Sequence, residues 1–299
     1  MSSRRRRGGA EKPIPLHSPT RLVFSSRPAL IAYVTCGDPD LATTRDVVLA
    51  AIRAGADVIE LGVPFSDPVA DGPVIQRASQ RALERGTRLA DVLELAREIR
   101  SQSDAGLIIF SYLNPVLRFG LEHFAAAAKD CGADGALITD LTVEEADEYL
   151  DAMRARNLAT VFLAAPTSTD ARLRRIAQAS SGFVYAVSRT GITGERKDVA
   201  DDARQLVARL RRRTRLPIAV GFGISTPEQF AQVGAFADAV VVGSALVHAM
   251  EDAGRDRAAI AVAQLIAVLK GKHSAVSAQR SAGDVARSRI GKEELSADR

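Results

Sequence analysis

Eight short apolar runs recur along the chain, separated by longer segments that mix polar and apolar residues. The runs are rich in β-branched and aliphatic residues and occupy residues 30–36, 57–62, 106–111, 135–139, 159–164, 183–188, 216–221 and 237–243. Runs that are apolar on both faces are typical of parallel strands covered by helices. We therefore predict one strand for each run.

The segments between the runs carry the apolar spacing of amphipathic helices. Helical patterns cover residues 41–55, 124–132, 142–157, 170–180, 226–236 and 256–270, and the longer stretch 75–103 has room for two helices. Eight strand–helix alternations favour a closed (β/α)8 barrel over an open sheet. The predicted fold is a single α/β TIM barrel with extra helices.

Three of the predicted helices end in a Gly–Ala pair, and an aspartate then opens the next strand. The copies are RAGAD (53–57), DCGAD (130–134) and VGAFAD (233–238). Glycine suits the left-handed position that follows many helices. This weak repetition is what a barrel of similar units predicts.

The length and the cysteines set the broad class of protein. The chain has 299 residues, 46% of them hydrophobic, which is enough for a large core. Its two cysteines, Cys36 and Cys131, form no CxxC pair, which favours a reducing compartment over a disulfide framework. No apolar run approaches the roughly 18 residues of a membrane helix, and no secretory h-region follows the basic N-terminus. We expect a cytoplasmic protein with no membrane partner.

The net charge of +4 is concentrated near the N-terminus. Residues 1–27 hold seven Lys or Arg and one Glu, and the chain's +4 less this +6 leaves −2 for residues 28–299. An arginine cluster can bind nucleic acid, but the acidic remainder argues against that role. The predicted domains are a disordered basic arm at 1–27, a catalytic barrel at 28–270 and a disordered polar tail at 271–299.

One predicted strand carries a carboxyl group where an apolar residue is expected. Glu60 stands among Val58, Ile59 and Leu61, and an unpaired carboxylate there costs several kcal/mol or takes up a proton. Alternation puts Val58, Glu60 and Gly62 on one face, so that Glu60 points into the barrel mouth, where barrel enzymes hold reactive residues. Burial there suits a carboxyl group to proton transfer near neutral pH. The alternative is a structural pairing with an internal Lys or Arg.

A second carboxyl group follows in the next loop. Asp71 comes eleven residues after Glu60, in a stretch stiffened by three prolines, and lies within reach of the same mouth. Two carboxyl groups in unlike environments can run acid–base chemistry at one pH. The pair therefore predicts catalysis.

Glycine-rich loops follow the last three predicted strands. GFGIS (221–225) and VGSALV (242–247) lie where many barrels bind phosphate, because glycine lets the backbone approach an anion and the next helix offers free N–H groups. Tight turns alone are the alternative. SRTGITGERKD (188–198) suits either a lid over the mouth or an ordinary surface loop.

The four histidines predict no metal site. His17 and His273 lie in the arm and the tail, and His123 and His248 have no Cys, Asp or Glu at metal-ligand spacing. No Gly-rich dinucleotide or P-loop fingerprint occurs.

Several motifs together resemble the tryptophan synthase α-subunit family. They are ELGVPFSDPVADGPVIQ (60–76), AYVTCGDPD (32–40), SRTGITG (188–194), GFGIS and VGSALV, within a resemblance that runs from about residue 28 to residue 270. The family is a barrel lyase that cleaves indole-3-glycerol phosphate by a retro-aldol reaction to indole and glyceraldehyde 3-phosphate. The resemblance implies L-tryptophan biosynthesis, no cofactor in this chain, and an α2β2 assembly whose β subunit holds pyridoxal phosphate. A stand-alone indole-releasing lyase and a non-catalytic barrel that binds a β subunit remain as alternatives.

The resemblance also implies roles for single residues. Glu60 matches the family's acid–base catalyst, and Asp71 matches the carboxylate that engages the indole N–H. The family's phosphate site is matched by Gly194, Gly223, Gly243 and Ser244. Its indole pocket is matched by Tyr33, Tyr185 and Phe222. The two loops that close the site and face the β subunit are matched by Asp67, Arg189 and Thr193.

Overall fold

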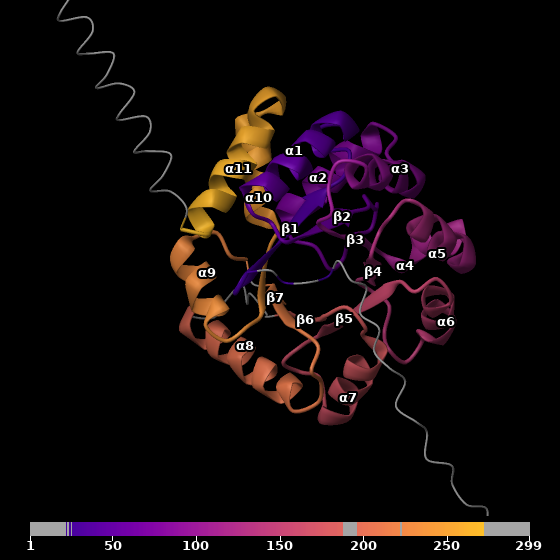
Figure 1. Ribbon diagram of the computed structural model, residues 1–299, viewed down its shortest axis with the longest axis vertical. Helices are drawn as coiled ribbons and strands as arrows, with labels where there is room; N and C mark the ends of the chain where they lie inside the picture. Colours follow the sequence, from indigo (N-terminus) through magenta and orange to yellow (C-terminus); the bar gives the residue numbers. More distant parts are fainter. Residues whose placement is uncertain (1–21, 23, 25, 188–195, 222, 272–299) are drawn as a thin grey trace, which may run out of the picture.

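Eight parallel strands pair in sequence order and close into a barrel in the computed structural model, which describes residues 22, 24, 26–187, 196–221 and 223–271 (Figure 1). The strands are β1 (Ala29–Thr35), β2 (Val58–Gly62), β3 (Gly106–Ser111), β4 (Gly135–Ile138), β5 (Ala159–Ala164), β6 (Val184–Val187), β7 (Ile218–Gly221) and β8 (Ala239–Val242). Because β1 pairs with both β2 and β8, the sheet closes between its first and last strands. The predicted barrel is confirmed.

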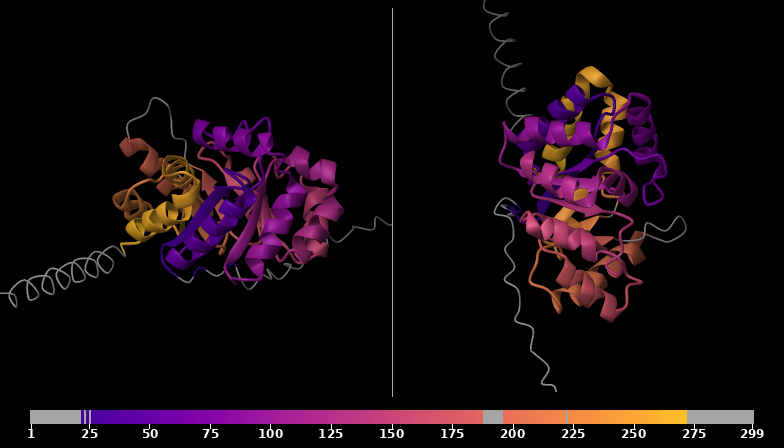
Figure 2. Two further views of the ribbon diagram at one scale, coloured as in Figure 1. Left: turned by 90° about the horizontal axis from the view of Figure 1, so that it is seen from above. Right: turned by 90° about the vertical axis from the view of Figure 1, so that its right-hand side faces the viewer.

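Helices surround the strands and cover the outside of the barrel (Figure 1). They are α1 (Leu41–Ala54), α2 (Pro73–Glu84), α3 (Leu89–Arg100), α4 (Leu113–Phe119), α5 (Leu121–Asp130), α6 (Asp147–Ala155), α7 (Asp170–Ala179), α8 (Arg196–Arg211), α9 (Pro227–Gly234), α10 (Ser244–Ala253) and α11 (Ala258–Leu269), with a 3-10 turn at Arg255–Arg257. Near the end of the described chain, α11 packs against α1 and α10, as the side views also show (Figure 2).

The predicted strands and most predicted helices are present, and the stretch 75–103 does hold two helices, α2 and α3. The helix predicted at 142–157 begins only at Asp147, because Leu141, Val143 and Ala146 turn inward and are buried ahead of it. No predicted helical range covers α4, α8 or α10. The last residues of the predicted lid, from Arg196, already belong to α8.

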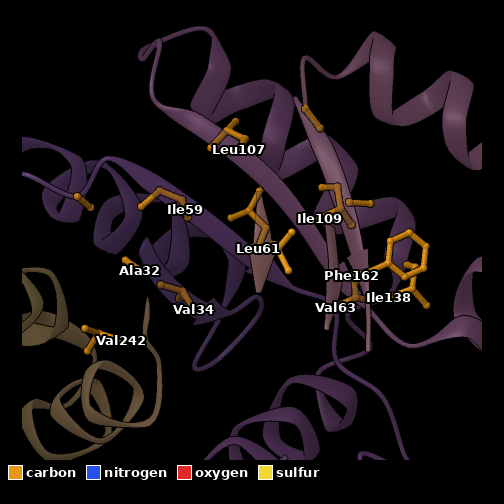
Figure 3. Close-up of a cluster of buried hydrophobic side chains, with 14 of the residues drawn as sticks. Ala32, Val34, Ile59, Leu61, Val63, Leu107, Ile109, Ile138, Phe162 and Val242 are labelled. Carbon is orange, nitrogen blue, oxygen red and sulfur yellow. The ribbon is translucent and has the colours of Figure 1, made fainter. Parts of the chain in front are cut away.

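Alternation along each strand sorts side chains into two layers. On β2, Ile59 and Leu61 face the helices and pack with Leu107 and Ile109 of β3 (Figure 3), whereas Val58 joins the cluster inside the barrel. The outer layer joins the sheet to its helices and forms the larger part of the core. The side chains at the inner positions of the strands therefore determine what lines the barrel mouth.

Reciprocal backbone and side-chain bonds tie the amino-terminal ends of the strands, here called the floor, into four pairs. In each pair one residue donates its backbone N–H to a carbonyl on the neighbouring strand and accepts the N–H of that same neighbour on its side chain. The pairs are Asp57 with Leu30, Asp134 with Leu107, Ser181 with Thr160 and Asp238 with Ile218, at 2.8–3.0 Å. The bonds join β1 to β2, β3 to β4, β5 to β6 and β7 to β8.

Each aspartate of the floor is also neutralised by a cation from a helix or its end. Lys270 lies 2.9 Å from Asp57, Arg100 lies 2.7 Å from Asp134, and Arg211 pairs with Asp238. A buried charge requires such a partner. The aspartates that the sequence repeat singled out are therefore structural.

Two of the three predicted helix-ending glycines adopt the left-handed conformation. Gly55 has φ +115° and Gly132 has φ +81°. The prediction for Gly234 is wrong, because this residue belongs to α9 and its φ is not positive. A Cβ on Gly234 would lie 2.2 Å from Cγ of Pro28, so close packing requires the glycine there.

Part of the predicted arm packs on the floor. Leu22 is buried and lies against Gly182, and the Phe24 ring lies 6.0 Å from that of Phe183. The packed body therefore starts before residue 28. Residues 1–21 and 272–299 lie outside the described part, so the disorder expected there stays a prediction.

Two further findings bear on the class of protein. Within the described residues, no helix is long and apolar enough to cross a membrane. Both cysteines are free and buried, Cys36 at the end of β1 and Cys131 at the end of α5.

We expect Asp134→Ala to lower the free energy of unfolding by about 3–5 kcal/mol, because it removes one partner of the nearly buried ion pair between Asp134 and Arg100. Urea denaturation measures the loss. Glu94→Ala, which breaks the exposed pair with Arg97, is the control and is expected to cost no more than about 1 kcal/mol. Equal losses would show that the floor pair contributes no more than a surface pair.

Candidate active site

Glu60 lies at the inner face of β2 with no exposed surface. Neither carboxyl oxygen has a hydrogen-bond partner within the described residues. Burial raises the pKa of Glu60 to about 8, because the charged form loses its hydration. Glu60 forms no ion pair within the described part of the chain, which argues against the alternative of a structural pairing. A buried, unpaired carboxyl group at a barrel mouth is poised to exchange a proton.

Asp71 lies in the loop between β2 and α2. Burial raises the pKa of Asp71 to about 6, and a hydrogen bond from the Tyr112 hydroxyl to Oδ2, at 3.0 Å, opposes that rise. At neutral pH Asp71 is therefore mostly charged while Glu60 is mostly protonated. The site thus holds both an acid and a carboxylate, and their different surroundings set the two apart.

Two buried tyrosines share the space around both carboxyl groups. Burial raises the pKa of Tyr33 on β1 and of Tyr185 on β6, and the negative charges of Asp71 and Glu60 contribute to both rises. Tyr33 is the strand neighbour of Glu60 and meets the Phe110 ring edge-on at 4.9 Å. The four groups therefore belong to one mouth.

Glycines make room for the two tyrosines. A Cβ on Gly62 would lie 2.4 Å from the Tyr33 hydroxyl, and one on Gly221 would lie 2.2 Å from the Tyr185 hydroxyl. Any larger residue would displace a ring, so these inner positions fix where the rings lie.

The amino-terminus of α10 opens beside Tyr33. Gly243 precedes the helix without a side-chain cap, Ser244 is its first residue, and a Cβ on Gly243 would lie 3.5 Å from Cβ of Tyr33. Gly223, in the loop after β7, has φ +62°. Uncapped N–H groups and the helix dipole favour an anion at such an end.

The remaining predicted residues are divided between the surface and the undescribed part. Asp67 is exposed and accepts the Ser66 hydroxyl at 2.5 Å. Gly194, Phe222, Arg189 and Thr193 lie outside the described residues. No group of three or more potential His, Cys, Asp or Glu metal ligands occurs among the residues that are described.

Sequence reasoning missed Tyr112, which contacts Asp71 directly. The available signal was its place, immediately after β3, where barrel loops carry functional side chains. Phe110, also at the carboxyl end of β3, packs on Tyr33.

Comparison with known proteins assigns the chain to a family. The family model described as tryptophan synthase alpha chain matches residues 21–277. The tryptophan synthase alpha chain of Solibacter usitatus is 57% identical over 226 residues, which are 76% of this chain and 85% of that one. The one from Geotalea uraniireducens is 47% identical over 255 residues, covering 85% and 96%.

Solved structures agree with the sequence relatives. A chain in the crystal structure of the tryptophan synthase complex from Pyrococcus furiosus superposes with a TM-score of 0.75 at 39% identity, covering 82% of this chain and 98% of that one.

We expect Glu60→Gln to stabilise the protein at alkaline pH. The folded pKa, about 8, exceeds the ordinary carboxyl value, so the folded state keeps a proton that the unfolded state releases, and wild-type stability falls as pH rises from about 4.5 to about 8. A difference of one between the folded and unfolded pKa values corresponds to about 1.4 kcal/mol. The gain in unfolding free energy of the variant should therefore grow by a few kcal/mol between pH 5 and pH 8.5.

Urea denaturation at several pH values measures this difference. The exposed Glu122→Gln is the control, since it removes a carboxyl group from the surface instead of the barrel mouth. A difference for Glu60→Gln that does not change with pH would contradict the burial of an unpaired carboxyl group.

Proposed function

The chain belongs to the tryptophan synthase alpha chain family, and from that premise we propose that Glu60 and Asp71 carry out its reaction at the barrel mouth. The protein is a lyase of L-tryptophan biosynthesis, the α subunit that cleaves indole-3-glycerol phosphate to indole and glyceraldehyde 3-phosphate. The observation that carries the residue assignment is the full burial of Glu60, without a hydrogen-bond partner among the described residues, in a mouth that it shares with Asp71.

The reaction requires two proton movements and no change of oxidation state. The bond between indole C3 and the glycerol chain breaks, C3 gains a proton, and the neighbouring hydroxyl loses one as its carbon becomes the aldehyde. Atoms and electrons balance without water, oxidant or reductant. One group that first gives a proton and then takes one back is sufficient.

Glu60 is suited to both proton movements. Because it is protonated at neutral pH, it can donate to C3 of the indole ring. The resulting carboxylate is buried without a partner and is therefore a strong base for the departing hydroxyl proton. The exchange returns Glu60 to its starting form, ready for the next substrate.

Asp71 is suited to the charge that protonation creates. A proton on C3 puts positive charge on the ring nitrogen, and a fixed carboxylate at the N–H stabilises that charge in a site of low dielectric. An uncharged group would do so less well. Asp71 is ionised above about pH 6, which fits this role.

The other mouth residues bind the two ends of the substrate. Tyr33 and Tyr185 are proposed to line the indole pocket, with Phe222. The phosphate group is assigned to the start of α10, at Gly243 and Ser244, with Gly223 and Gly194 from the neighbouring loops. The uncapped end of α10 beside Tyr33 supports this assignment, since it puts a place for an anion next to a residue of the proposed pocket.

A β subunit is the proposed partner, in an α2β2 assembly in which that subunit holds pyridoxal phosphate. Val69, at the tip of the loop before Asp71, is 84% exposed, which is unusual for an apolar side chain. Phe65, earlier in the same loop, lines a groove of about 570 Å³, and Asn114 and Arg118 of α4 also line it. We propose that the β subunit docks against this loop and groove, and that Asp67, Arg189 and Thr193 also contact it. The free cysteines fit a cytoplasmic location.

We expect Glu60→Gln to abolish indole release, and Asp71→Asn to lower kcat by about 10²–10³-fold, as for loss of one group that stabilises transition-state charge. In the wild type, kcat/KM should rise as Asp71 ionises near pH 6 and fall as Glu60 loses its proton near pH 8. Indole release from indole-3-glycerol phosphate measures both. A rate that stays high well above pH 8 would remove Glu60 from the acid role.

Titration with a β subunit tests the partner. Contact with the loop at Val69 should order it, and because ordering costs roughly 1–2 kcal/mol per residue, the rate of indole release should rise about tenfold or more. Val69→Asp should require more β subunit for the same rise, whereas Ile260→Asp, a change at another exposed aliphatic residue, on α11, should not. A rate that does not respond to the β subunit would favour the stand-alone lyase.

A further inference from the structure

Tyr112 is placed to control Asp71 although it lies on a different element. It follows β3 directly, begins α4 as its N-cap residue and is 2% exposed. Its hydroxyl lies 3.0 Å from Oδ2 of Asp71 and 3.0 Å from the backbone nitrogen of Ala70. One side chain therefore holds both the carboxyl group and the backbone next to it.

The two contacts fix the direction of the hydroxyl proton. Because the oxygen accepts the N–H of Ala70, the single O–H is free to donate to Asp71. Burial, and then the charge of Asp71, raise the pKa of Tyr112, so the hydroxyl keeps its proton throughout the working range. Tyr112 can therefore only favour the charged form of its partner.

The Tyr112 ring secures the other end of the same loop. Phe65, near the start of the loop, lies with its ring 5.0 Å from that of Tyr112, tilted by 31°. The backbone N–H of Val63, just ahead of it, bonds to the Phe110 carbonyl at 2.8 Å. The loop between β2 and α2 is thus held at both ends against the end of β3, and Val69 at its tip stays outside.

We propose that Tyr112 is a positioning residue, which holds the Asp71 carboxylate at the barrel mouth through the hydrogen bond from its hydroxyl. This inference rests on the proposed roles of Glu60 and Asp71. The described titratable groups that share the space with Asp71 are Tyr33 from β1, Glu60 from β2, Tyr112 after β3 and Tyr185 from β6. Tyr112 is the one with a hydrogen bond to the carboxylate.

Tyr112→Phe tests the hydroxyl while keeping the ring that packs on Phe65. Without the hydrogen bond, the pKa of Asp71 should rise by about one pH unit above its present value of about 6. The acidic limb of kcat/KM for indole release should move up by the same amount, so the rate falls about tenfold at the foot of that limb and much less near pH 7.5. The alkaline limb, which reports Glu60, should stay in place.

Tyr149→Phe is the matched control. Tyr149 is also buried and loses a single hydroxyl bond, to the Ala136 carbonyl at 3.2 Å, but it lies on α6 outside the barrel. It should leave both limbs where they are. A double variant adds a second check, because in an Asp71→Asn background Tyr112→Phe should cost little more.

A readout without turnover separates this inference from the function on which it rests. Carboxyl ¹³C resonances of the protein alone report the pKa of Asp71, identified as the resonance that Asp71→Asn removes. If wild-type protein released no indole, the proposed function would fail while this titration still tested Tyr112. An unchanged Asp71 titration in Tyr112→Phe, or a rate lowered equally at all pH values, would overturn the inference and leave Tyr112 a packing role only.

Discussion

Burial of the Glu60 carboxyl group without a partner is the constraint on which the site depends. The strand keeps Glu60 out of water, and no described cation or donor offsets the loss of hydration, so the neutral form is favoured up to about pH 8. This burial is unfavourable for stability at alkaline pH but useful for proton transfer. Tyr33, Tyr185 and the glycines opposite them are arranged around that protonated acid.

The two ends of the barrel treat buried charge in opposite ways. On the floor, Asp57, Asp134 and Asp238 are each matched by a cation and a backbone N–H, so charge there ties strands together. At the mouth, Glu60 is left unmatched. A closed sheet held firmly at one end can tolerate an unsatisfied group at the other, because the strands that carry it cannot shift to relieve it.

The second carboxyl group depends on tertiary contacts more than the first. Asp71 is on a loop, and its charge state results from burial opposed by one hydrogen bond from Tyr112. The same tyrosine packs on Phe65, which lines the groove between this loop and α4. A partner seated in that groove would touch the loop that carries Asp71, so the proposed docking and the proposed catalysis would meet at Tyr112.

The sequence by itself determined the barrel and the position of Glu60, because both follow from local periodicity: apolar runs on two faces require covering helices, and alternation assigns Glu60 to the inner face of its strand. It also marked the aspartates of the floor as a repeat. Only the tertiary structure decided their partners, since Lys270 meets Asp57 from 213 residues away. The same holds for Tyr112, which is 41 residues from Asp71, and for Gly234, whose glycine is required by contact with Pro28. Helix α6 begins late for a similar reason, because residues of its predicted first turn are buried elsewhere. Such contacts arise when the sheet closes, and closure brings together residues whose spacing along the chain carries no periodic signal.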